Sequence, residues 1–240
     1  NELLYYIDNN FYSMSVIDNI NLGRAQALLG SKQFYKADIA FIDVLIEHPN
    51  NITALIGRAQ IALKQGKLKN AFNLTDQALA LEPDNISALL LNASLNQMKG
   101  NLKQALKAIK YAMSIKPNSS PTRLIYSTLL MEQGQILAAK AEIEKVLLIL
   151  PNEPGANFIK YLSSLYLGRT GESEETLANL VSIFETIPEN IKQDFPIFYY
   201  IASLVDFQQK NYNKARISMV AYLQVNDQDI KAQILNAKIA

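Results

Sequence analysis

A period of 34 residues is the feature of this 240-residue sequence that most constrains its fold. Four prolines and two sets of alanines keep that spacing: Pro49, Pro83, Pro117 and Pro151; Ala37, Ala71, Ala105 and Ala139; and Ala25, Ala59 and Ala93. A fixed period of this length is the signature of a repeat architecture, in which each repeat forms one small unit of secondary structure.

Each period predicts two helices joined by a tight turn. The turns contain a glycine, which we place at Gly66, Gly100 and Gly134 and, in the less regular fifth unit, at Gly171. The proline ends the second helix, because proline cannot continue the backbone hydrogen bonding of a helix. Such hairpins cannot bury their apolar faces alone and stack on one another. The sequence therefore predicts an all-α fold, a right-handed α-solenoid of about six helical hairpins.

The spacing also predicts where the repeats begin and end within a single solenoid over residues 1–240. Pro188 follows Pro151 by 37 residues, and no proline ends the next unit, so the register loosens after Pro151. We expect regular repeats over residues 13–49, 52–83, 86–117 and 120–151. Divergent repeats are expected over residues 154–188 and 195–227, a closing helix over residues 228–240, and a remnant of an earlier repeat over residues 1–12.

These marks resemble the tetratricopeptide repeat (TPR) family. The shared features are the small residue of the first helix, the turn glycine, the alanine that opens the second helix, a small residue near its end (Ala78, Ala112) and the final proline. In that family the first helix of each repeat lines a concave groove that binds a partner. The resemblance places the fifth and ninth positions of each repeat in such a groove: Leu22, Gln26, Ile56, Gln60, Leu90, Ser94, Leu124, Thr128, Phe158, Leu162, Tyr200 and Leu204.

The groove positions are largely uncharged. Family members that act as cochaperones hold a partner's C-terminal carboxylate with Lys and Asn at the fifth and ninth positions, whereas this sequence has leucine and glutamine there, which excludes that function. An exposed apolar groove would instead bind an amphipathic helix or an extended segment of a partner protein. The alternative is that these apolar side chains pack between neighbouring repeats and leave no unusual groove.

Composition excludes most catalytic chemistry. The sequence has no cysteine and one histidine, His48, which removes thiolate metal sites and Ser-His or Cys-His groupings within one chain. It has no glycine-rich phosphate loop and no metal-spaced cluster. We therefore expect no catalytic residue, no cofactor and no metal, and a protein that is not an enzyme.

With a net charge of +1 and no apolar run of about 20 residues, we expect neither nucleic-acid binding nor a membrane span.

Charge is segregated along the chain although the total is balanced. The stretch from Arg58 to Lys116 has nine basic and three acidic residues. The stretch from Glu172 to Asp194 has one basic and six acidic residues. Two explanations are open. The charges form a solvated outer face, or they are electrostatic handles, including handles for self-association.

These observations favour a non-catalytic scaffold or adaptor for other proteins. Segments Pro196–Ala202 and Asn211–Ala215 also resemble bacterial PEP-CTERM-system TPR-repeat lipoproteins, which implies a role in exopolysaccharide production or protein sorting. That resemblance implies a periplasmic or outer-membrane-associated protein with a lipid-bearing cysteine upstream of residue 1. If the lipoprotein resemblance does not hold, a cytoplasmic location is expected. The alternative function is the regulatory arm of a larger multidomain enzyme or transcription regulator.

Overall fold

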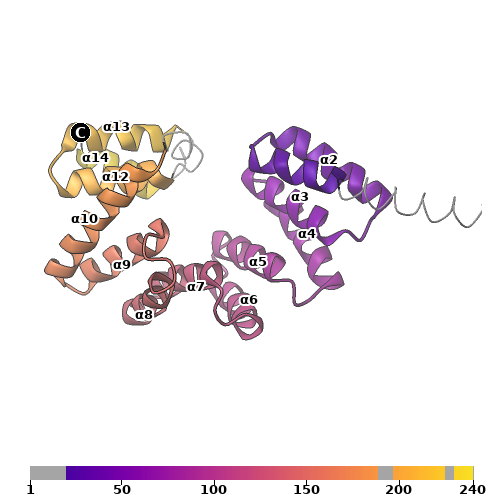
Figure 1. The fold of residues 1–240 in the computed structure, drawn as a ribbon, viewed down its shortest axis with the longest axis horizontal. Coiled ribbons are helices and arrows are strands. Elements are labelled where there is room, and N and C mark those ends of the chain that lie inside the picture. The colour runs from indigo at the N-terminus through magenta and orange to yellow at the C-terminus, as the bar shows by residue number, and fades with distance from the viewer. Residues whose placement is uncertain (1–19, 189–196, 225–229, 240) are drawn as a thin grey trace, which may run out of the picture. The chain divides into compact units, whose positions relative to one another are not determined.

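The computed structural model describes residues 20–188, 197–224 and 230–239, and every regular element among them is a helix (Figure 1). Residues 20–30 are helical and are followed by α2 (Phe34–Glu47). The next helices are α3 (Ile52–Lys64), α4 (Leu68–Leu81), α5 (Ile86–Met98), α6 (Leu102–Ile115), α7 (Ser120–Glu132), α8 (Ile136–Leu147), α9 (Pro154–Tyr166), α10 (Thr170–Thr186), α12 (Ile197–Gln208), α13 (Tyr212–Leu223) and α14 (Ile230–Ile239). The all-α fold predicted from the sequence is confirmed, and its helices alternate as first and second members of hairpins.

Asparagine and glutamate side chains begin several first helices directly after the turn that ends the preceding repeat. The side-chain oxygens of Asn51 and Asn85 accept hydrogen bonds from backbone N–H groups three residues later, at 2.9 and 3.0 Å. Glu153 makes the equivalent contact at the start of α9. Each side chain satisfies one of the backbone donors that a helix start leaves unpaired, which fixes the boundary between repeats.

Four glycines form the turns inside the hairpins. Gly66, Gly100, Gly134 and Gly168 have φ values between 68° and 79°, a left-handed conformation that side chains with a Cβ disfavour. The turn between α9 and α10 therefore uses Gly168, which keeps the 34-residue spacing. The prediction that Gly171 forms this turn is wrong, because Gly171 lies inside α10.

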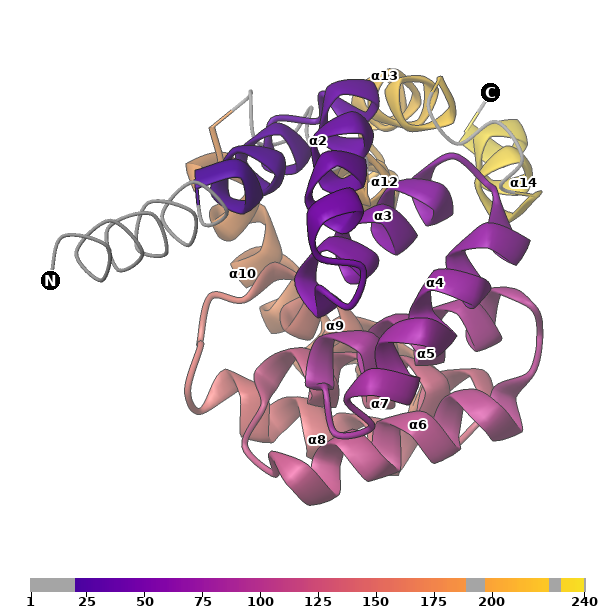
Figure 2. The same cartoon turned by 90° about the vertical axis from the view of Figure 1, so that its right-hand side faces the viewer.

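The helices form two compact units, residues 1–125 and 126–240. In the first unit α3 contacts α2, α4 and α5, while α5 contacts α4 and α6 (Figure 2). In the second unit α9 contacts α8 and α10, α12 contacts α10 and α13, and α14 packs on α13. These contacts join helices of the same hairpin or of consecutive hairpins, including the first helices α3 and α5, as expected for stacked hairpins. The remnant repeat expected over residues 1–12 lies outside the described residues.

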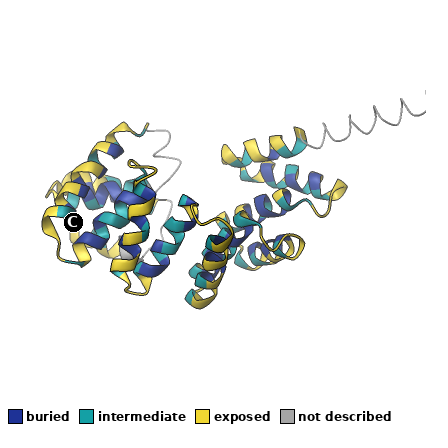
Figure 3. Cartoon of the chain, turned by 60° about the horizontal axis from the view of Figure 1, so that its bottom comes forward, coloured by how far each residue is buried: buried dark blue, intermediate teal, exposed yellow. Residues whose placement is uncertain are grey.

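The buried residues include small alanines as well as larger apolar residues, and the ribbon coloured by burial shows their positions along the helices (Figure 3). The alanines that repeat every 34 residues are fully buried: Ala25, Ala37, Ala59, Ala71, Ala93, Ala105 and Ala139. Gly57 shows the tightest approach. A Cβ at this position would lie 2.3 Å from the ring of Phe41 in α2.

Candidate functional site

Charged residues are distributed unequally between the first and second helices of the hairpins. Among the first helices, α5 has no charged residue, α9 and α12 have one each, and α3 and α7 have two each. Among the second helices, α2, α8 and α10 have four each, α6 has three, and α4 and α13 have two each. The first helices therefore form the least charged surface that the repeats offer.

In the first unit, the predicted groove residues differ in how far they are exposed. Gln26 and Gln60 are exposed, and the half-buried ones are Leu22, Leu90, Ser94 and Leu124. Ile56 is only 7% exposed and packs in a core cluster with Leu55 and Leu95. The accessible part of these positions in the first unit is consequently rich in amide and hydroxyl groups.

In the second unit, all five predicted groove residues are half-buried: Thr128, Phe158, Leu162, Tyr200 and Leu204. Phe158 and Leu162 pack on one side against the core cluster that contains Tyr161 and Leu177. The Tyr200 ring lies 5.1 Å from that of Tyr222, measured between centroids. Each of these side chains takes part in packing between helices and also leaves some surface accessible. The two alternatives expected from the sequence, packing between repeats and exposure to a partner, therefore each describe part of their environment.

The last turn of two first helices carries exposed apolar side chains that the sequence-based groove omitted. Met98 ends α5 with 61% of its surface exposed, and Tyr166 ends α9 with 72% exposed. The two residues are 68 positions apart, which is two full periods, but Lys64 and Glu132 occupy the equivalent positions in α3 and α7, so the repeat spacing alone would not have identified them. Met98 and Tyr166 add uncharged surface at the ends of α5 and α9.

One buried polar side chain of the second unit, that of Asn157, is hydrogen-bonded within the fold. The Asn157 side chain donates hydrogen bonds to the backbone carbonyls of Pro151 and Glu153, at 2.8 and 3.0 Å, and its oxygen accepts one from Asn179 at 2.9 Å. Asn157 is 3% exposed, so this network joins α9 to α10. It holds the repeats together and leaves no group free for a ligand.

Glu172 is part of an ion pair between repeats. The buried Lys140 ammonium in α8 donates a hydrogen bond to Glu172 in the first turn of α10, and Glu144 lies 3.9 Å from the same ammonium. The hydrogen bond from Lys140 lowers the pKa of the Glu172 carboxyl. A carboxylate held in its charged form by a buried lysine has a structural role, and it does not form an acid–base pair with another carboxylate.

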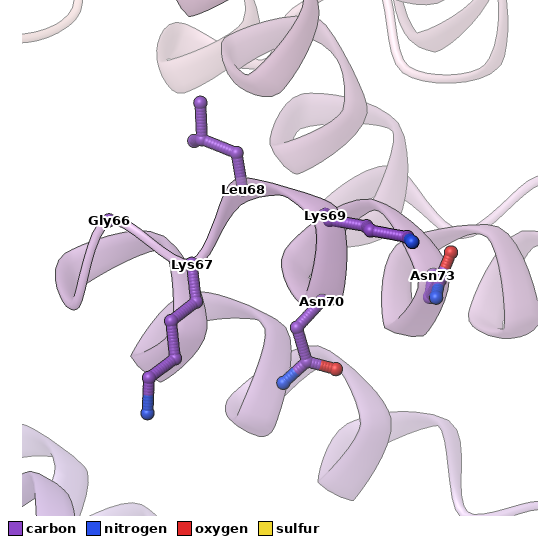
Figure 4. A pocket seen from close by; sticks show the side chains of 6 residues that line it. All are labelled: Gly66, Lys67, Leu68, Lys69, Asn70 and Asn73. Atoms are coloured by element: carbon purple, nitrogen blue, oxygen red, sulfur yellow. The ribbon is translucent and has the colours of Figure 1, made fainter.

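An open depression of about 600 Å³ lies at the start of α4 (Figure 4). Its lining residues are Gly66, Lys67, Leu68, Lys69, Asn70 and Asn73, and all except Leu68 are exposed. It has no buried polar group that could orient a small molecule. Within the described ranges, no group of three or more side chains could hold a metal ion, and no helix is long and apolar enough to cross a membrane.

Comparisons with known proteins give matches in structure alone. No family model matches the sequence, and no curated protein matches it. A tetratricopeptide repeat protein from Parabacteroides merdae ATCC 43184 matches with a TM-score of 0.69 and 15% identity, over 92% of this chain and 84% of that one. PilW, a type IV pilus biogenesis factor, matches with a TM-score of 0.68 and 18% identity, over 93% and 99%. A chain of the APC/C hetero-tetramer Cut9–Hcn1 matches with a TM-score of 0.73 and 15% identity, over 90% of this chain and 41% of that one.

Proposed function

We propose, from the premise that this chain has the tetratricopeptide repeat fold, that it is a non-catalytic scaffold that binds a segment of a partner protein. The binding surface would be formed by the first helices. The observation that carries this proposal is the segregation of charge, because the first helices hold few charged residues while the second helices hold many. Uncharged surface is costly to leave exposed in a continuous stretch and commonly marks an interaction site.

The exposed groups indicate the chemistry of the partner segment. Gln26 and Gln60 can both donate and accept hydrogen bonds, so in the first unit they suit a polar, uncharged strand or helix face. Phe158 and Leu162 in the second unit suit apolar side chains spaced along an amphipathic helix. Because charge contributes little to either contact, binding would change little with salt.

The wider role proposed for the scaffold is in the bacterial envelope. Its support is the resemblance of Pro196–Ala202 and Asn211–Ala215 to PEP-CTERM-system lipoproteins, together with the likeness in fold to PilW, a type IV pilus biogenesis factor. This role would place the protein in the periplasm or at the outer membrane and its partner in exopolysaccharide production or protein sorting. A regulatory arm of a larger enzyme or transcription regulator is the second candidate, supported by the uncharged groove alone.

The binding surface can be tested with glutamines, since exposed glutamines occur on both kinds of helix. A photo-crosslinking amino acid is placed at Gln26 or Gln60 on first helices and, as matched controls, at Gln77 or Gln104 on second helices. After crosslinking in the native organism, partners are identified by mass spectrometry. We expect a specific partner to crosslink to the first-helix positions and not to the controls.

A second pair of variants tests whether that contact contributes to affinity. Q26R/Q60R introduces charge on the first helices, and Q77R/Q104R introduces the same charge on the second helices. All four side chains are exposed, so both variants are expected to fold. Binding of the identified partner that is lost only in Q26R/Q60R supports the proposal. Equal binding by both variants, or crosslinks confined to the second helices, would contradict it.

A further inference from the structure

A row of lysines lies on the second helices of the first unit. Lys103, Lys107 and Lys110 are spaced at i, i+4 and i+7 along α6, which places them on one side of that helix. Lys69 in α4 occupies the position equivalent to Lys103 one period earlier. With Lys67 and Lys99 in the adjoining turns, these six exposed residues form a surface that we name the basic face.

The basic face has few internal partners for its charge. Among the described residues, no carboxylate lies within 4.0 Å of any of its six ammonium groups. Lys99 alone has another contact, with its ammonium 5.6 Å from the centre of the Phe72 ring. The exposed apolar residues Tyr111 and Ile115 lie on the same helix as the row. A surface of this kind combines apolar contact area with unneutralised positive charge.

The second unit has the opposite charge on its second helices. Glu174, Glu175 and Glu185 in α10 are exposed, and none of them forms an ion pair among the described residues. Glu174 and Glu185 are eleven residues apart, which is three helical turns, so they lie in line. Lys140 connects α10 to α8, which has the exposed apolar residues Leu137 and Ala141, and the exposed Leu148 follows directly after α8. We name these six residues the acidic face.

The two faces share one repeat position on second helices of successive repeats. Lys107 in α6, Ala141 in α8 and Glu175 in α10 are separated by one period each, so they occupy the same position in successive repeats. All three side chains are exposed. The second helices thus present two surfaces, one that combines positive charge with apolar residues and one that combines negative charge with apolar residues. The whole first unit carries 13 basic and nine acidic residues, and the second carries 10 basic and 13 acidic ones.

We propose that the protein associates with itself through contact between the basic face of one copy and the acidic face of a second copy. The charge complementarity identifies the occupant as another copy of this chain, because exposed lysines on one face and exposed glutamates on the other form no ion pair among the described residues. The contact joins two different patches and is therefore heterologous. It uses the second helices and does not depend on the proposed partner surface of the first helices.

Sedimentation equilibrium of the purified chain tests this proposal. We expect self-association at low ionic strength that weakens at least about tenfold between roughly 50 and 300 mM NaCl, because exposed charges are screened. The basic-face variant K103E/K107E/K110E and the acidic-face variant E174K/E175K/E185K should each remain monomeric under the same conditions. Circular dichroism checks that both variants are folded.

Mixing the two variants gives the decisive result. Each variant retains one native face and has the other reversed, so an equimolar mixture regains complementary pairs and should associate as the wild type does. The control K210E/R216E/K238E has the same change in net charge as the basic-face variant, at exposed positions outside both faces, and it should self-associate normally. A wild-type chain that stays monomeric at about 200 μM and low salt would overturn the proposal, as would a mixture that fails to associate.

Discussion

At the scale of single residues, Gly23 and Gly57 occupy equivalent positions in consecutive repeats but have different surroundings. Both lie in the repeated sequence Gly-Arg-Ala-Gln. Gly57 is buried in α3 against the fully buried ring of Phe41, whereas a Cβ at Gly23 would meet no described atom within 4 Å. The 34-residue period alone did not reveal the close approach at Gly57, because it comes from the side chain of Phe41 in the preceding second helix.

We predict that Gly57→Ala destabilises the protein by about 1–2 kcal/mol. Overpacking against a buried ring costs about 1–3 kcal/mol, and the better helix propensity of alanine offsets up to about 1 kcal/mol. The measurement is the urea midpoint of unfolding, followed by circular dichroism. The matched control Gly23→Ala should be neutral or stabilising by up to about 1 kcal/mol. If the two substitutions had equal effects, the close approach of Phe41 would be disproved.

At the scale of helices and repeats, ion pairing joins α8 to α10. Lys140 is buried, and the Glu172 side chain that accepts its hydrogen bond is 27% exposed. A buried ammonium without a carboxylate partner is destabilising, while an apolar replacement of the whole pair is often tolerated. The contact therefore stabilises the fold chiefly because it pairs the buried charge of Lys140.

We predict that Glu172→Gln lowers the free energy of unfolding by about 1–3 kcal/mol, because it leaves the buried Lys140 with only the distant Glu144. The double variant K140M/E172Q should recover most of the loss, since it removes the unpaired charge. Urea unfolding at neutral pH measures both. Failure of the double variant to recover would show that the charge of Lys140 was not the cause.

The same pair predicts a pH dependence of stability. The pKa of Glu172 is lowered in the folded state relative to its ordinary value of 4.5, so its contribution is fully present above that value. The contribution is lost as the pH falls through the lowered pKa, because the protonated carboxyl no longer pairs with Lys140. The stability difference between the wild type and E172Q should therefore shrink from neutral pH toward about pH 3. A difference that stays constant over this range would contradict the assignment.

Much of the fold at this scale could be predicted from the sequence, and the exceptions have identifiable causes. A proline at a fixed spacing follows the end of α2, α4 and α6, and buried alanines occur at the same spacing. This pattern was sufficient to predict the hairpins. The turn of the fifth hairpin was misplaced because Gly168 and Gly171 are close together and only the backbone conformation distinguishes them. The burial of Ile56 depends on packing against residues of neighbouring helices, including Leu74 and Leu91, which no pattern within α3 reveals.

At the scale of the whole molecule, the contacts within each unit join helices of the same hairpin or of consecutive hairpins. Stability in such proteins is approximately a sum of repeat terms and nearest-neighbour interface terms. A local defect is therefore expected to loosen nearby helices more than distant ones. This behaviour differs from that of a domain with one shared core, in which all parts unfold together.

Hydrogen exchange of Gly57→Ala can distinguish these behaviours. The substitution strains the contact between α2 and α3, so we expect amide protection to fall by about 5- to 30-fold in α2–α5, the equivalent of about 1–2 kcal/mol. Protection in α12–α14 should remain at the wild-type value, because the nearest-neighbour account confines the effect of a local defect to nearby repeats. Gly23→Ala is the control and should not reduce protection in α3. A uniform loss of protection in all described helices would show that the chain unfolds as a single cooperative unit, and the nearest-neighbour account would then fail.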